Sequence, residues 1–133
     1  GPLTISAIRA ATHLVIPAQM EQFSIEGIYG MLQLWKQETY ARTKRNPIEL
    51  VGILPNQVRN INIHKSFLAD LKNKEFTSKY VIPHEIKKRA IYTEILADNA
   101  NPKSIFELPQ DSIERIEYEN ACKYITEKVF NHG

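Results

Sequence analysis

The sequence has little cysteine, little glycine and no long apolar run, and each shortage excludes a class of protein. The single cysteine among 133 residues, Cys122, rules out an internal disulfide framework and fits a reducing cytoplasm. No apolar run approaches the roughly 20 residues that cross a bilayer, and no signal-peptide pattern is found, so we expect a cytoplasmic protein without a membrane partner. The five glycines form no Gly-Lys-Ser or Gly-Lys-Thr motif, so these residues contain no phosphate-binding loop.

The overall composition is that of an ordinary globular protein, but the charges are unevenly distributed. Hydrophobic residues make up 43% and charged residues 24% of the chain, and the formal net charge is only +2. Residues 65–90 nevertheless contain seven lysines and arginines against three acidic residues. A basic stretch of this kind can contact phosphates, and a solvated charged surface explains it equally well.

Three short runs rich in apolar and β-branched residues each end at a proline and are separated by helical patterns. Such an alternation predicts an α/β fold with parallel strands buried on both faces of the sheet. Because proline has no N–H to donate, we expect each proline to end its strand. Ligands of parallel sheets bind at the carboxyl ends of the strands, so the residues after each proline are candidates for function. The predicted strands cover about 12–17, 48–54 and 78–82, and the prolines are Pro17, Pro55 and Pro83.

Helical periodicity accounts for most of the remaining sequence. Ser24 is placed to cap a helix of about 25–42, and a second amphipathic pattern covers about 63–73. Asp111 and Glu114 have the spacing of a capping box at the start of the last helix. Neither a repeat nor a linker interrupts the chain, so we expect one domain over residues 1–133. A short helix is also predicted at 3–11, and the last helix has an apolar face of Tyr118, Ala121, Cys122, Ile125 and Val129.

An ordered set of short motifs carries a resemblance to a known family. The motifs are AATHLVIPAQMEQFSIEG at 10–27, NPIELVGIL at 46–54, His64 followed by FLADL at 67–71, VIP at 81–83 and KSIFEL at 103–108. In order and spacing they resemble the C-terminal half of the ParA (Soj-like) partition ATPases, a branch of the deviant-Walker P-loop ATPases that includes MinD. The resemblance implies part of a parallel-stranded P-loop NTPase-like sheet with flanking helices, whose N-terminal half is missing from this chain.

The same resemblance implies what the parent protein would do. It would segregate plasmid or chromosomal DNA in the bacterial cytoplasm, in association with the nucleoid. It would bind ATP with Mg²⁺ between two subunits, bind double-stranded DNA without sequence preference, and respond to a ParB-like adaptor. Because the phosphate-binding loop is not among these residues, we assign no catalytic or metal-binding residue to them. We expect this chain alone to bind no ATP and to be inactive as an ATPase.

Residues of the candidate sites follow from the resemblance, and each has a simpler interpretation beside it. Asn56 falls where relatives place an amide against adenine, but an asparagine after proline is also a common turn residue. Pro83 and His84 fall in the loop that lies against the base and ribose, or they simply end a strand. The proposed DNA contacts are Lys74, Lys79, Lys87, Lys88 and Arg89, which a solvated surface would also explain.

The sequence departs from the family after Pro83, and a second function class stays open. Residues 84–90 read HEIKKRA where the family has an arginine and a Ser-His-Gly string. The alternative is a truncated relative without enzymatic activity that acts as a binding or regulatory module. The coding sequence upstream of Gly1 separates the two, because an ATPase requires a phosphate-binding loop there. His64 is expected to be a surface or packing histidine, not a metal ligand.

Overall fold

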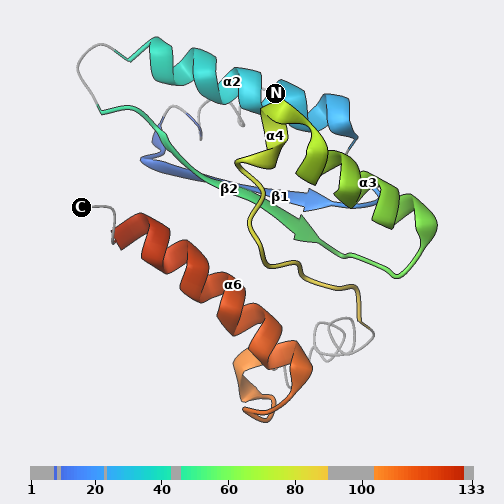
Figure 1. The fold of residues 1–133 in the computed structure, drawn as a ribbon. Helices are drawn as coiled ribbons and strands as arrows, with labels where there is room; N and C mark the ends of the chain where they lie inside the picture. Colours follow the sequence, from blue (N-terminus) through green and yellow to red (C-terminus); the bar gives the residue numbers. More distant parts are fainter. Residues whose placement is uncertain (1–7, 9, 23, 43–45, 90–103, 131–133) are drawn as a thin grey trace.

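The computed structural model describes residue 8 and residues 10–22, 24–42, 46–89 and 104–130. The elements in chain order are β1 (His13–Gln19), α2 (Ile25–Tyr40), β2 (Glu49–Asn56), α3 (Asn62–Asn73), α4 (Glu75–Ser78), the 3-10 helix η1 (Ile105–Glu107) and α6 (Ile113–Phe130). The helix predicted at 3–11 lies almost wholly outside the described residues. Figure 1 shows α2 and α3 on one side of the sheet and α6 on the other. No helix in the described part of the chain is long and apolar enough to cross a membrane.

β1 and β2 form a two-stranded parallel sheet, which confirms the predicted α/β class and the direction of the first two strands. The pairing runs from His13 opposite Glu49 to Gln19 opposite Asn56, so both strands end at the same edge. Helix α2 makes the crossover that a parallel pair requires. Ser24 caps it as predicted, because its hydroxyl accepts a hydrogen bond from the Gly27 N–H at 3.1 Å.

Pro17 and Pro55 do not end their strands, so this prediction was wrong. Both lie inside the parallel ladder, with Pro17 opposite Leu54 and Pro55 opposite Ala18. The reason is the direction in which each residue presents its backbone. Thr12 and Met20 bond to β2, so the even-numbered residues of β1 face β2 and the odd-numbered ones, Pro17 included, face away from it. The missing N–H of Pro17 therefore costs no bond between β1 and β2.

The third predicted strand, 78–82, is only partly present. Residues 75–78 form α4, and the chain then runs parallel to β2 as residues 80–88, here called the edge segment. It pairs at two isolated bridges, one with β2 (Ile53 with Val81) and one just past the end of β2 (Val58 with Lys87). Between these bridges Pro55 can accept a hydrogen bond, from Ile86 N–H at 2.9 Å, but cannot donate one. The missing donor explains why the pairing is interrupted at this point.

Gly52 allows the edge segment to approach β2. Its φ of +154° is unfavourable for residues with a side chain, and a Cβ at this position would lie 2.6 Å from Ile82 Cγ1 and 2.7 Å from the Tyr80 carbonyl oxygen. The hydrogen bonds that join the two segments at this point, Ile53 N–H to Tyr80 O and Ile82 N–H to Ile53 O, are both 2.8 Å long. A glycine is therefore required where β2 and the edge segment meet.

The hydrophobic core lies between the sheet and the helices α2 and α3. Trp35 borders this core, and its indole N–H donates a 2.8 Å hydrogen bond to the Ile48 carbonyl, which joins α2 to the residue before β2. Burial of these side chains is the main force that holds the two helices on the sheet. The buried members of the core are Ile16, Ala18, Met20, Ile28, Leu32, Ile53, Val58, Leu68 and Leu71.

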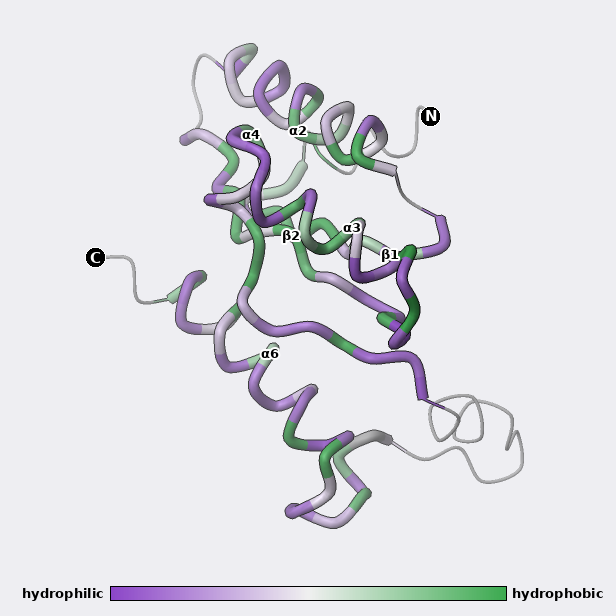
Figure 2. Tube along the Cα trace, turned by 45° about the vertical axis from the view of Figure 1, so that its right-hand side comes forward, coloured by the Kyte–Doolittle hydropathy of each residue, from purple (hydrophilic) through white to green (hydrophobic). Residues whose placement is uncertain are grey.

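Helix α6 lies on the opposite side of the sheet and is attached there in part by polar contacts. Ser112, not Asp111, caps it, because the Ser112 hydroxyl accepts a hydrogen bond from the Arg115 N–H at 3.3 Å. Of the predicted apolar face only Ala121 is buried, and Cys122 is exposed. Figure 2 shows α6 as largely hydrophilic with short hydrophobic stretches. The Glu117 carboxylate holds the helix, accepting 2.7 Å and 3.0 Å hydrogen bonds from the Lys87 N–H and the Arg89 guanidinium.

Candidate functional site

Asn56 lies at the carboxyl edge of the sheet, beside Gln19, as the strand prediction requires. Its side-chain oxygen accepts a 2.9 Å hydrogen bond from the Gln57 N–H, and Gln57 has a φ of +53°. The amide oxygen of Asn56 therefore stabilises a turn, as asparagine commonly does. Its side-chain nitrogen has no hydrogen-bond partner among the described residues, and so it remains available to a ligand.

Pro83 and His84 lie elsewhere, in the interruption between the two bridges of the edge segment. The His84 ring meets the Tyr124 ring of α6 edge to face, with 5.7 Å between centroids. The two residues line a cavity of about 330 Å³ whose other walls come from Glu85 and from α6. Asn56 is not part of this lining, so the structure does not place the three predicted nucleotide contacts in one pocket. Because the edge segment continues past His84 to Lys88, Pro83 and His84 lie in the middle of this segment and not beside Asn56 at the carboxyl edge of the sheet.

A polar cluster that the sequence did not predict joins the loops at the carboxyl edge. The guanidinium of Arg59, after β2, pairs at 3.1 Å with the carboxylate of Glu21, after β1. The Arg59 backbone N–H donates a 2.8 Å hydrogen bond to His64 Nδ1. The hydrogen bond from Arg59 is the largest cause that lowers the pKa of Glu21 below its ordinary value of 4.5, followed by the charge of Lys88. These contacts fix the two loops relative to each other.

His64 is a packing histidine, the second of the two predicted roles. Its side chain is fully buried, with 0% exposed, at the start of α3. Because Nδ1 accepts the bond from Arg59, the neutral ring carries its proton on Nε2, and Nε2 has no hydrogen-bond partner within the described residues. Its position depends on the turn at Gln57 and on the path of residues 57–61, which sequence periodicity does not reveal.

The five predicted DNA contacts do not form one continuous patch. Arg89 is paired with Glu117 at 3.0 Å, and Lys88 lies close enough to Glu21 to lower the pKa of that carboxyl group. The Lys79 ammonium lies 5.1 Å from the centre of the Tyr80 ring, before the first bridge. Lys87 belongs to the second bridge, which pairs with Val58, five residues after the Ile53 of the first bridge.

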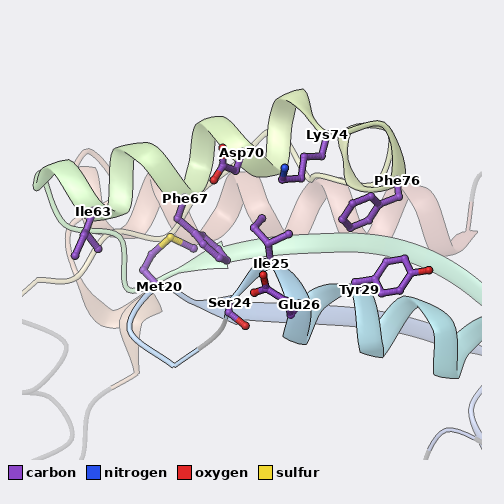
Figure 3. A pocket seen from close by; sticks show the side chains of 10 residues that line it. All are labelled: Met20, Ser24, Ile25, Glu26, Tyr29, Ile63, Phe67, Asp70, Lys74 and Phe76. Carbon is purple, nitrogen blue, oxygen red and sulfur yellow. The ribbon is translucent and has the colours of Figure 1, made fainter.

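A groove of about 770 Å³ lies between α2 and the pair α3–α4 (Figure 3). Lys74, a predicted DNA contact, lines this groove. The sequence prediction missed the groove because helical periodicity does not show whether a neighbouring element covers a face. The lining residues are Met20, Ser24, Ile25, Glu26, Tyr29, Ile63, Phe67, Asp70, Lys74 and Phe76.

The described residues contain no group of three or more histidine, cysteine, aspartate or glutamate side chains placed to hold a metal ion. The comparisons with known proteins gave no match either to a protein-family model or to a curated protein.

Proposed function

We propose that this chain is the C-terminal half of a ParA-type partition ATPase domain. The observation that carries the proposal is the parallel pair β1–β2, which ends with Gln19 and Asn56 side by side at one edge. Parallel α/β sheets bind ligands at this edge, and three of the motifs that resemble the family lie on β1 with the start of α2, on β2 and on α3. In this proposal the parent protein moves plasmid or chromosomal DNA through ATP-dependent dimerisation and sequence-independent DNA binding.

Asn56 is the residue through which this chain would recognise the nucleotide base. The amide oxygen already accepts the hydrogen bond from the Gln57 N–H, so the orientation of the Asn56 side chain, and with it the position of its nitrogen, is fixed. A preformed donor loses little conformational entropy when it binds, which favours recognition of a ring nitrogen of adenine. Pro83 and His84 face α6 in the present arrangement, so the nucleotide proposal depends on Asn56.

The phosphates and Mg²⁺ would be held by residues outside this chain. ATP hydrolysis depends on positioning and on charge stabilisation at the phosphates, and the 133 residues contain no Gly-Lys-Ser or Gly-Lys-Thr motif for that purpose. We therefore assign recognition of the base, and not catalysis, to this part of the protein. A second subunit and a ParB-like adaptor belong to the same proposal.

Fewer of the predicted lysines and arginines remain available to contact DNA than the sequence suggests. Lys79 and Lys87 are exposed on opposite sides of the first bridge, whereas the charge of Arg89 is neutralised by Glu117. Lysines that contact only phosphates give binding that weakens steeply with salt and is insensitive to base sequence.

The test uses the full-length protein with the substitution Asn56→Asp, which keeps an oxygen to accept the Gln57 N–H but removes the amide donor. We expect ATP affinity, measured by titration calorimetry, to fall about tenfold, because a lost hydrogen bond and an added negative charge both oppose binding. Gln57→Ala is the matched control, since it leaves the Asn56 amide in place. ATP binding that is unchanged in Asn56→Asp contradicts the role of this residue. A wild-type protein that binds no ATP contradicts the ATPase proposal and favours the regulatory module.

A further inference from the structure

The groove between α2 and α3–α4 has the shape and lining of a protein-binding site. Its floor is apolar, with Met20 and Phe67 at one end and Phe76 at the other (Figure 3). The Phe76 ring meets the Tyr29 ring edge to face, with 5.0 Å between centroids and an interplanar angle of 80°. Aromatic side chains held in this way provide a rigid apolar surface, which is common at the centre of protein interfaces.

Two large apolar side chains of the groove remain in contact with water. Ile63 on α3 is 75% exposed and Tyr29 on α2 is 46% exposed. They lie toward the two ends of the groove, so the exposed apolar surface follows its length (Figure 3). Scattered exposed hydrophobic residues need no explanation, but a continuous apolar groove with a polar rim indicates an interaction site.

The rim of the groove carries three charged side chains that make no ionic or hydrogen-bonding contact within the described residues. Glu26 projects from α2 and Asp70 from α3, across the groove from each other, and Lys74 lies one turn beyond Asp70 (Figure 3). Because the two carboxylates face each other across the groove, they would attract a cationic side chain placed between them.

We propose that this groove binds an amphipathic helix of another protein, with a lysine or arginine of that helix placed between Glu26 and Asp70. Helix α3 has 12 residues and is about 18 Å long, so the groove beside it accommodates about three turns of a ligand helix. Helices bind such grooves through apolar residues at i, i+3 or i+4, and i+7. The apolar residues would cover Ile63, Phe67 and Tyr29, and an acidic residue one turn from the cationic one would meet Lys74.

The proposal goes beyond the proposed nucleotide and DNA functions and does not depend on them. It uses neither the carboxyl edge at Asn56 nor the edge segment. It also gives Lys74 a role in the groove, separate from Lys79, with which the sequence grouped it.

The experiment selects ligands from a displayed library of helical 14-residue peptides, panned against the full-length protein. We expect enrichment of peptides with an apolar stripe and one lysine or arginine beside it. Binding of these peptides, measured by fluorescence anisotropy, should weaken by more than about tenfold with Asp70→Lys, because like charges then face each other. Ile63→Ser should weaken it by about tenfold through lost apolar contact. Panning against Asp70→Lys should select acidic peptides in place of basic ones.

Matched controls place the same changes on the other side of the molecule. Glu127→Lys reverses an exposed charge on α6, and Ile113→Ser removes an exposed isoleucine at its start, so neither should alter peptide binding. Absence of enriched peptides, or enriched peptides that bind Asp70→Lys as well as wild type, overturns the proposal. A wild-type dimer in sedimentation experiments that Asp70→Lys and Ile63→Ser each dissociate would assign the groove to a second copy of this chain and would also overturn it.

Discussion

Replacing Gly52 by alanine should destabilise the protein more than any other change of one methyl group in the sheet. Two effects act together at this residue. An alanine cannot adopt a φ of +154° without strain, and its Cβ would overlap Ile82 Cγ1 and the Tyr80 carbonyl. The carbonyl belongs to the backbone and cannot move by rotation of a side chain. The edge segment would therefore have to move away from β2.

The magnitude follows from what that movement breaks. Backbone strain of this type costs about 1–3 kcal/mol. Separation of the two segments lengthens the 2.8 Å hydrogen bonds between Ile53 and residues Tyr80 and Ile82, and each contributes about 1 kcal/mol to stability. We therefore expect the free energy of unfolding to fall by about 3–5 kcal/mol, a large part of the 5–15 kcal/mol that is typical of a domain.

Urea denaturation followed by circular dichroism measures this change. With a typical slope of about 1–3 kcal/mol per molar urea, the midpoint should fall by about 2 M. Gly30→Ala is the matched control: a Cβ at Gly30 has no neighbouring atom within 4 Å, and alanine favours the helix by about 1 kcal/mol. That variant should be slightly more stable than wild type. A loss below 1 kcal/mol in Gly52→Ala would refute the close approach of β2 and the edge segment.

Two further predictions concern the polar contacts. Glu117→Ala should weaken the attachment of α6 by about 2–3 kcal/mol, because the carboxylate accepts hydrogen bonds from both Lys87 and Arg89. In a hydrogen-exchange experiment the amides of α6 should then exchange faster, while the exchange of the α3 amides should not change. Arg59→Ala should raise the pKa of Glu21 toward 4.5 in an NMR titration. Since the folded state lowers this pKa, the contribution of Glu21 to stability is present above about pH 4.5 and is lost as the pH falls. Arg59→Ala should reduce that dependence, because the charge of Lys88 still lowers the pKa, and an unchanged Glu21 titration would contradict the prediction.

The sequence was sufficient to predict the elements that rely on local patterns. The two parallel strands and the helices at 25–42 and 63–73 were predicted within about two residues of their observed ends, because apolar periodicity and the Ser24 cap depend on neighbours in sequence. The prediction that each proline ends its strand was wrong for Pro17 and Pro55, because a missing N–H interrupts pairing only where another segment lies opposite it. At Pro17 none faces it within the described sheet, and at Pro55 the edge segment does.

The candidate sites show the same limit. Asn56 was placed correctly at the strand end, since that position follows directly from the strand. The position of His84 against Tyr124 depends on where α6 packs, and the exposure of Tyr29 and Ile63 depends on how far apart α2 and α3 lie. Both are tertiary properties, and no local pattern encodes them.

The interrupted pairing at Pro55 has a consequence for how this protein tolerates changes in length. Sheet hydrogen bonds are made by Ile82 before the interruption and by Ile86 after it, and Pro83 has no N–H of its own. A residue inserted next to His84 would therefore leave every bond of the edge segment to β2 in place. Residues 83–85, between these two bonds, are therefore the position where a short peptide tag or a fluorescent label can be introduced without disturbing the sheet. An insertion next to Gly52 would instead destroy the pairing of β2 with the edge segment.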